Sequence, residues 1–217
     1  MKKANLFYSL TTFILCFSFI SFTQKKSNKE FIGTITYSIT AISKNPRILS
    51  ESLTKRVGHK LVISIKNGNY RMTYDGGDIQ KVYYLKSTNT EYSLRKEIDS
   101  LFMLSFDKED RLLKGSTILD STAVVCGRKC NILINELEDI RSIYYYDPAL
   151  YLNPENYKND KFGYANKYYE KAKSPWLKYE YQGKNLILIY TAIKVEEKEL
   201  SDSTFELPKL PMKNWPK

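Results

Sequence analysis

The stretch that decides the fold is Leu61-Val62-Ile63-Ser64-Ile65-Lys66-Asn67-Gly68-Asn69-Tyr70-Arg71-Met72-Thr73-Tyr74. Apolar and polar residues alternate on both sides of Asn67-Gly68, the preferred pair for a two-residue type I′ hairpin turn. In that register Ile65 faces Tyr70, Ile63 faces Met72 and Leu61 faces Tyr74, so these six side chains share one face. A slip of one residue would expose all six. The sequence therefore predicts a β-hairpin with one buried face.

Extended structure is predicted on both sides of this hairpin. Before it, Ile35, Tyr37, Ile39 and Ala41 alternate with hydroxyl residues, which is the period of a half-buried strand. After it, apolar or aromatic runs are bounded by turn residues. We expect further strands at 82–85, 90–94, 101–106, 118–125, 131–134, 142–146, 176–181, 186–195 and 205–207.

A single helical segment interrupts this pattern. Phe162, Ala165, Tyr168, Tyr169 and Ala172 recur at helical spacing within 153–174. About ten strands cannot all be covered by one such helix, so the sheet must close into a barrel, fold into a sandwich, or remain a half-barrel around an apolar hollow. We expect a mainly β fold, a single curved antiparallel sheet with one or two short helices.

The N-terminus has the pattern of an export signal. Lys2 and Lys3 precede an uncharged apolar run, and Ser21 and Thr23 suit a cleavage site. An uncleaved anchor is the alternative, although the run is short for a bilayer span. No small residue precedes Cys16, which disfavours lipidation. We expect an exported protein of the periplasm, cell envelope or extracellular space, whose mature chain does not span the membrane.

The expected organisation has four parts. Residues 1–23 form the signal peptide, 24–30 a polar leader, 31–208 the β domain with its helical insert near 153–174, and 209–217 an irregular, proline-containing tail. The formal net charge is +10, but lysines are scattered among acidic residues and no run of five or six like charges occurs. We therefore do not expect nucleic acid as a partner.

Cys126 and Cys130 flank Gly127-Arg128-Lys129. If these three residues form the loop of a hairpin, the two cysteines lie opposite each other at its base, where a disulfide can form. An oxidising compartment would favour the bond. We therefore expect a disulfide between Cys126 and Cys130.

Residues for catalysis or metal binding are scarce. His59 is the single histidine, which excludes a site with several histidine ligands. The acidic stretches 75–78 and 107–110 lack the spacing of a dedicated calcium loop and occur where turns are needed. No phosphate loop or nucleophile elbow is present. We predict no enzyme activity, no catalytic residue, no metal site and no cofactor.

Three short motifs resemble a known group of proteins. Gly33-Thr34-Ile35-Thr36-Tyr37, the 65–72 hairpin and Cys126-Gly127-Arg128-Lys129-Cys130 occur in an order similar to that in exported Bacteroidota proteins of the GLPGLI family and related domains of unknown function. The ending Ser203-Thr204-Phe205-Glu206-Leu207-Pro208 is similar too, whereas the Gly-Leu-Pro-Gly-Leu-Ile signature is absent. This resemblance implies a half-barrel like that of the lipoprotein carriers LolA and LolB, with helices over an apolar hollow.

These observations lead to one main functional hypothesis and two alternatives. The main one is a non-enzymatic envelope protein that binds an apolar or amphipathic ligand, such as a lipid or acyl chain, in the hollow of the sheet. The first alternative is a structural or interaction protein, an accessory of an envelope complex, that docks another envelope protein through a strand edge or the tyrosine-rich insert. The second is an enzyme acting on envelope polymers. The candidate ligand-lining residues are Ile35, Tyr37, Ile39, Ile63, Ile65 and Met72.

Overall fold

The computed structural model of the protein describes residues 29–215, so the expected signal peptide and most of the leader lie outside the described residues. The described chain is mainly β, with two α-helices, α1 (Ser50–Val57) and α2 (Ala165–Ala172), and three short 3-10 helices, η1 (Pro154–Asn156), η2 (Phe162–Tyr164) and η3 (Asp202–Phe205). The strands are β1 (Gly33–Ser43), β2 (Lys60–Lys66), β3 (Asn69–Tyr74), β4 (Ile79–Leu85), β5 (Thr90–Arg95), β6 (Leu101–Ser105), β7 (Leu113–Val125), β8 (Arg128–Leu137), β9 (Arg141–Tyr146), β10 (Trp176–Gln182), β11 (Leu186–Glu197) and β12 (Met212–Asn214).

All of these strands belong to one open sheet of 12 strands, in the order β12-β6-β5-β4-β3-β2-β1-β11-β10-β9-β8-β7. The pairing is antiparallel except at one edge, where β12 pairs with β6 in parallel. This edge corrects two expectations, because the sheet is mixed and the tail 209–217 is not wholly irregular. Before β12 the chain passes β3 as the short helix η3, where the Arg71 guanidinium donates to the Thr204 carbonyl oxygen. It then reaches the edge of the sheet and pairs with β6 in the parallel direction.

The predicted hairpin is confirmed residue by residue. Ile65 pairs with Tyr70, Ile63 with Met72 and Leu61 with Tyr74. Asn67 and Gly68 have φ angles of 51° and 84°, as a type I′ turn requires. A Cβ atom on Gly68 would lie 2.7 Å from the Cβ of Asn156, so this turn is also pressed against the insert.

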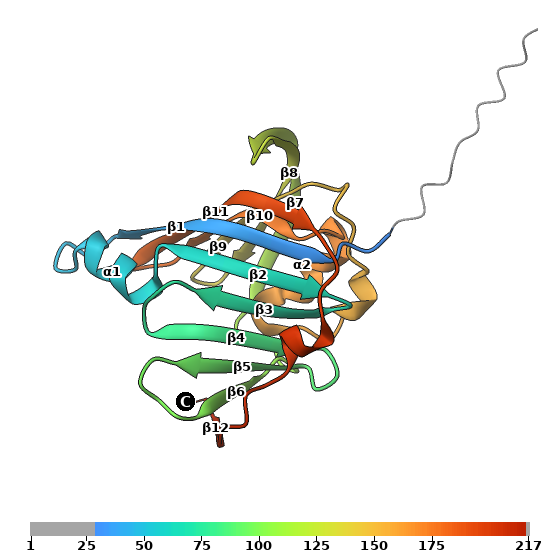
Figure 1. Cartoon of the computed structure of the whole chain (residues 1–217). Helices are drawn as coiled ribbons and strands as arrows, with labels where there is room; N and C mark the ends of the chain where they lie inside the picture. The colour runs from blue at the N-terminus through green and yellow to red at the C-terminus, as the bar shows by residue number, and fades with distance from the viewer. Residues whose placement is uncertain (1–28, 216–217) are drawn as a thin grey trace, which may run out of the picture.

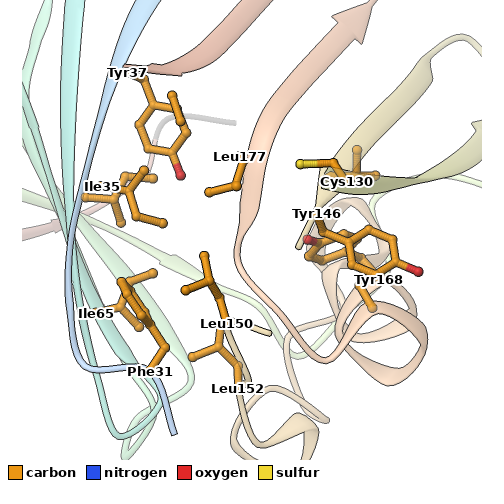
Figure 2. Packing of buried hydrophobic residues seen from close by; sticks show 14 of the residues in the cluster. Phe31, Ile35, Tyr37, Ile65, Cys130, Tyr146, Leu150, Leu152, Tyr168 and Leu177 are labelled. Carbon is orange, nitrogen blue, oxygen red and sulfur yellow. The ribbon is translucent and has the colours of Figure 1, made fainter. Parts of the chain in front are cut away.

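The sheet curls so that its two halves share one core. Ile63 of β2 and Tyr144 of β9 belong to the same buried cluster, although three strands separate β2 from β9 in the sheet. In Figure 1 strands β1 to β6 form the near layer, and β8 to β11 lie behind them. Figure 2 shows Ile35 and Tyr37 on one side of this core and Tyr146 and Tyr168 on the other. The predicted curved sheet is therefore present.

The helical insert is shorter than the predicted 153–174, because Gly163 and Tyr164 adopt left-handed φ angles of 57° and 58° and α2 begins only at Ala165. Its tyrosines point inward: Tyr168 is 1% exposed and Tyr169 9% exposed. The insert therefore fills the opening between the two layers and does not offer these rings as a docking surface.

Two further segments differ from the sequence prediction. Helix α1 was not predicted, since Leu53 is its one buried residue and its other positions are largely polar. The predicted strand 205–207 is wrong, because Asp202–Phe205 forms η3 instead. The Ser201 hydroxyl accepts a hydrogen bond from the Ser203 amide and starts that turn, and Phe205 is buried at its end.

The expected disulfide is not formed, because both Cys126 and Cys130 are free. The hairpin loop is the two-residue turn Cys126-Gly127, with φ angles of 51° and 72°, and Val125 pairs with Arg128. Cys130 therefore faces Ala123 across the strands, while Cys126 lies at the tip of the loop. Burial raises the pKa of the Cys130 thiol to about 11, which keeps it protonated.

Within residues 29–215, no helix has both the length and the apolar character needed to cross a membrane.

Candidate functional site: an aromatic cavity between the two layers

A cavity of about 340 Å³ lies between the two halves of the sheet and the helical insert. This volume falls within the range of roughly 300–1,000 Å³ that is usual for small-molecule sites. Tyrosine is the most frequent residue in its wall, and aliphatic side chains, other aromatic rings and charged side chains supply most of the remainder. Residues that line it are Tyr37, Ile63, Ile65, Tyr70, Met72, Glu91, Phe106, Asp110, Arg111, Leu137, Ile140, Ser142, Tyr144, Tyr157, Asp160, Phe162, Gly163, Ala165, Tyr168, Tyr169, Pro175, Trp176, Tyr179 and Tyr181.

Four of the six residues expected to line a hollow do line this cavity: Tyr37, Ile63, Ile65 and Met72. The other two, Ile35 and Ile39, do not belong to its wall. They are 0% and 6% exposed and form part of the closed core beside the cavity. The inward face of β1 is thus shared between the closed core and the cavity, which Tyr37 reaches together with the hairpin pairs Ile65–Tyr70 and Ile63–Met72.

One part of the wall is held rigid by hydrogen bonds from tyrosine hydroxyls to the backbone. The Tyr37 hydroxyl donates to the Trp176 carbonyl oxygen at 2.7 Å, and the Tyr168 hydroxyl donates to the Ser174 carbonyl oxygen at 2.9 Å. Tyr144 stacks between Tyr168 and Tyr179, with ring centroids 4.3 Å and 4.8 Å away. Aromatic stacking and satisfied hydroxyls fix these rings in place, so this part of the cavity is preformed.

Another part of the wall carries two acidic side chains. Asp160, between η1 and η2, is 2% exposed, and its Oδ1 atom has no hydrogen-bond partner among the described residues. Burial and the nearby charge of Glu91 raise the pKa of Asp160 well above its ordinary value. Burial also raises the pKa of Glu91, on β5, to about 7. Both carboxyl groups are therefore held in apolar surroundings that disfavour their charge.

Tyrosine rings line the same cavity as these carboxyl groups. Tyr70 stacks on Tyr84 with ring centroids 4.9 Å apart, and Tyr157 stacks on Tyr169 at 3.9 Å. Burial raises the pKa of all four hydroxyls, and the charge of Asp160 raises each of them further. The charge of Asp160 thus acts on both stacked pairs, of which one belongs to strands β3 and β4 and the other to the insert.

Among the described residues, the single basic one in the cavity wall is Arg111, and its charge is already paired. Its Nε atom lies 2.7 Å from the Asp110 carboxylate, and its Nη1 atom lies 3.2 Å from that of Asp139. Between residues 29 and 215 no group of three or more His, Cys, Asp or Glu side chains is arranged to hold a metal ion. The cavity therefore offers aromatic surface and two unpaired carboxyl groups.

Nothing in the sequence singles out Glu91, Asp160 or Trp176 as a site residue. Glu91 has no local motif around it, and Asp160 belongs to a loop without periodicity. The tyrosines of the insert can be noticed in the sequence, because Tyr168 and Tyr169 are adjacent. Helical spacing alone, however, does not tell whether such rings line a cavity or pack in a closed core.

This fold and site define a class of protein: a single curved sheet, open at both edges, with an aromatic cavity between its two layers. No family model matches the chain and no curated protein matches it. The predicted kinship with exported Bacteroidota proteins of the GLPGLI type therefore stays a prediction.

Solved structures with a similar arrangement of strands do exist. The chain is similar to PNGF-II in its P21 crystal form, with a TM-score of 0.47 and 8% identity over 84% of this chain and 32% of that chain. It therefore spans about a third of the PNGF-II chain. It is also similar to the LolA superfamily protein NE2245 from Nitrosomonas europaea, with a TM-score of 0.37 and 9% identity over 82% and 91% of the two chains. LprF from Mycobacterium bovis matches with a TM-score of 0.33 and 7% identity over 78% and 88%.

Proposed function

We propose that the protein is an exported, non-enzymatic binding protein that holds an apolar or amphipathic ligand in the cavity between its sheet layers. The observation that carries this proposal is the preformed cavity of about 340 Å³ with an aromatic and aliphatic wall. A space of this size exposes apolar surface that a bound ligand would remove from water, which is the usual driving force for such binding. Export rests on the pattern of residues 1–23.

Native mass spectrometry after mild purification tests the proposal. We expect the protein to carry a small-molecule adduct that organic extraction removes, and the extracted protein to bind 1-decanol. Met72→Trp places a larger side chain in the cavity wall and should abolish both adducts. Met103→Trp is the matched control, because Met103 is also half-buried but does not line the cavity. A wild-type protein that arrives without ligand and does not bind 1-decanol would contradict the proposal.

One observation favours the alternative, an interaction protein. Strand β7 is an edge strand of 13 residues, and Ile118, Leu119 and Val124 on it are 45%, 36% and 75% exposed. An exposed edge with apolar side chains is suited to accept a strand from another envelope protein. Val124→Lys should weaken partner capture on this alternative and leave 1-decanol binding unchanged.

A further inference from the structure

The side chain of Asp160 is the least explained polar group in the cavity. It is 2% exposed and lines the cavity, yet its Oδ1 atom has no hydrogen-bond partner among the described residues. Buried polar atoms are nearly always paired, so each exception needs a reason. A ligand that donates a hydrogen bond to this oxygen would supply the missing partner.

The surroundings of Asp160 suit a positive charge. Tyr70, Tyr157 and Tyr169 line the cavity, and each ring belongs to a stacked pair. The charge of Asp160 raises the pKa of all three hydroxyls. The face of an aromatic ring attracts cations, and several tyrosines around one point are the usual way to recognise an ammonium group. Glu91 adds a second carboxyl group to the same region, since its charge acts on both Asp160 and Tyr70.

The charge balance of the wall opposes a negative group. Within residues 29–215, Arg111 is the one basic residue that lines the cavity, and Asp110 and Asp139 already neutralise it. Glu91 and Asp160 have no comparable basic partner among the described residues. A carboxylate or phosphate placed beside them would meet like charge in a region of low dielectric, whereas an ammonium would meet opposite charge.

We propose that the ligand is an amphipathic amine, whose apolar body occupies the aliphatic and aromatic part of the cavity and whose ammonium group is bound by Asp160, Glu91 and the rings of Tyr70, Tyr157 and Tyr169. This inference rests on the proposed function and specifies the chemical class of its ligand. The ammonium donates to Asp160 Oδ1 and displaces a proton from the carboxyl group to the solvent.

Binding of the amine should therefore depend on pH. The titratable groups that face Asp160 are Glu91 from β5, Tyr70 from β3, Tyr84 from β4, Tyr157 after η1 and Tyr169 from α2. The tyrosines stay neutral below pH 10, because burial raises their pKa values. Burial raises the pKa of Glu91 to about 7, so Glu91 gains its negative charge between pH 5 and 8. Affinity for an alkylammonium should rise across this range.

Calorimetric titration with three probes of equal chain length tests the inference: decylamine, 1-decanol and decanoate. At pH 8 we expect the wild-type protein to bind decylamine about tenfold or more tightly than 1-decanol, and decanoate most weakly. Asp160→Asn and Glu91→Gln should each remove most of the preference for decylamine and leave 1-decanol binding in place. Glu155→Gln is the matched control, because Glu155 is an exposed carboxylate of the same insert.

The outcomes separate the inference from the function on which it rests. Equal affinity for decylamine and 1-decanol, or a preference for decylamine that Glu91→Gln retains, refutes the inference that the ligand is an amine. Either result leaves the proposed function as a binding protein intact. Tighter binding of decanoate refutes the amine inference too. If none of the three probes binds the wild-type protein, the proposed function itself is wrong. Should Asp160→Asn fail to fold, Glu91→Gln and the pH dependence of decylamine binding still decide the question.

Discussion

Replacing Glu91 with glutamine should change how the stability of the protein depends on pH. The carboxyl group of Glu91 faces the cavity, and burial raises its pKa from an ordinary 4.5 to about 7. The folded state therefore holds this proton more tightly than the unfolded state does. Wild-type stability should fall as pH rises from about 4.5 to about 7, and the penalty should be complete above that range.

The size of the effect follows from the two pKa values. At about 1.4 kcal/mol per pH unit, the difference between 4.5 and about 7 corresponds to roughly 3 kcal/mol. Glu91→Gln carries no such penalty, so the variant should gain roughly 3 kcal/mol relative to the wild type between pH 4.5 and pH 8. Urea unfolding followed by tryptophan fluorescence at several pH values measures this difference.

A surface carboxylate provides the control for this experiment. Glu199 is exposed, and Glu199→Gln should track the wild type at every pH. If Glu91→Gln also tracks the wild type, Glu91 is solvated and the cavity does not have the low dielectric that the structure indicates.

Three further predictions concern the core, the turn and the cysteines. Leu177→Ala should destabilise the protein by about 2–5 kcal/mol in urea unfolding, because Leu177 is 0% exposed, whereas Leu112→Ala, at a position 61% exposed, should change little. Gly68→Ala should lower the melting temperature more than Gly127→Ala: both glycines have positive φ, but only at Gly68 would the new Cβ meet a neighbour, the Asn156 Cβ at 2.7 Å. Equal effects of the two substitutions would contradict the close contact. Alkylation with peptide mapping should label Cys126 in the folded protein and Cys130 only after unfolding, and recovery of a peptide containing a Cys126–Cys130 disulfide would show that the loop register is wrong.

The strand pattern of the sequence predicts much of the architecture, because alternation fixes which side chains face inward. Ile63 and Met72 were paired correctly since Asn67-Gly68 permits only one tight register. The same reasoning failed at Cys126. Its φ of 51° makes it the first residue of a type I′ turn, a position where Asn, Asp or Gly is usual, so the sequence pointed to a loop one residue later.

The polar part of the cavity could not be predicted, because alternation in β5 gives no unique inward face. Glu91 pairs with Tyr84 and points inward, whereas Tyr92 pairs with Tyr83 on the outer side and is still only 7% exposed. Tyr83 in turn pairs with Arg71, which the η3 segment contacts, so the outer side of these strands is covered as well. When both faces of a strand are buried, the residue that faces the cavity need not be the more apolar one. Which face points to the cavity is then set by tertiary structure and not by the local pattern.

We expect the space between the sheet layers to bind a ligand, and Trp176 reports on this binding directly. Trp176 lines the cavity, whereas Trp215 packs against Phe102 near the edge strand β12, with ring centroids 6.0 Å apart. Titration of Trp215→Phe with 1-decanol should produce a saturable change in the emission of Trp176, and Trp176→Phe should show no such change from Trp215. An unchanged Trp176 signal, or an equal response from Trp215, would contradict the account.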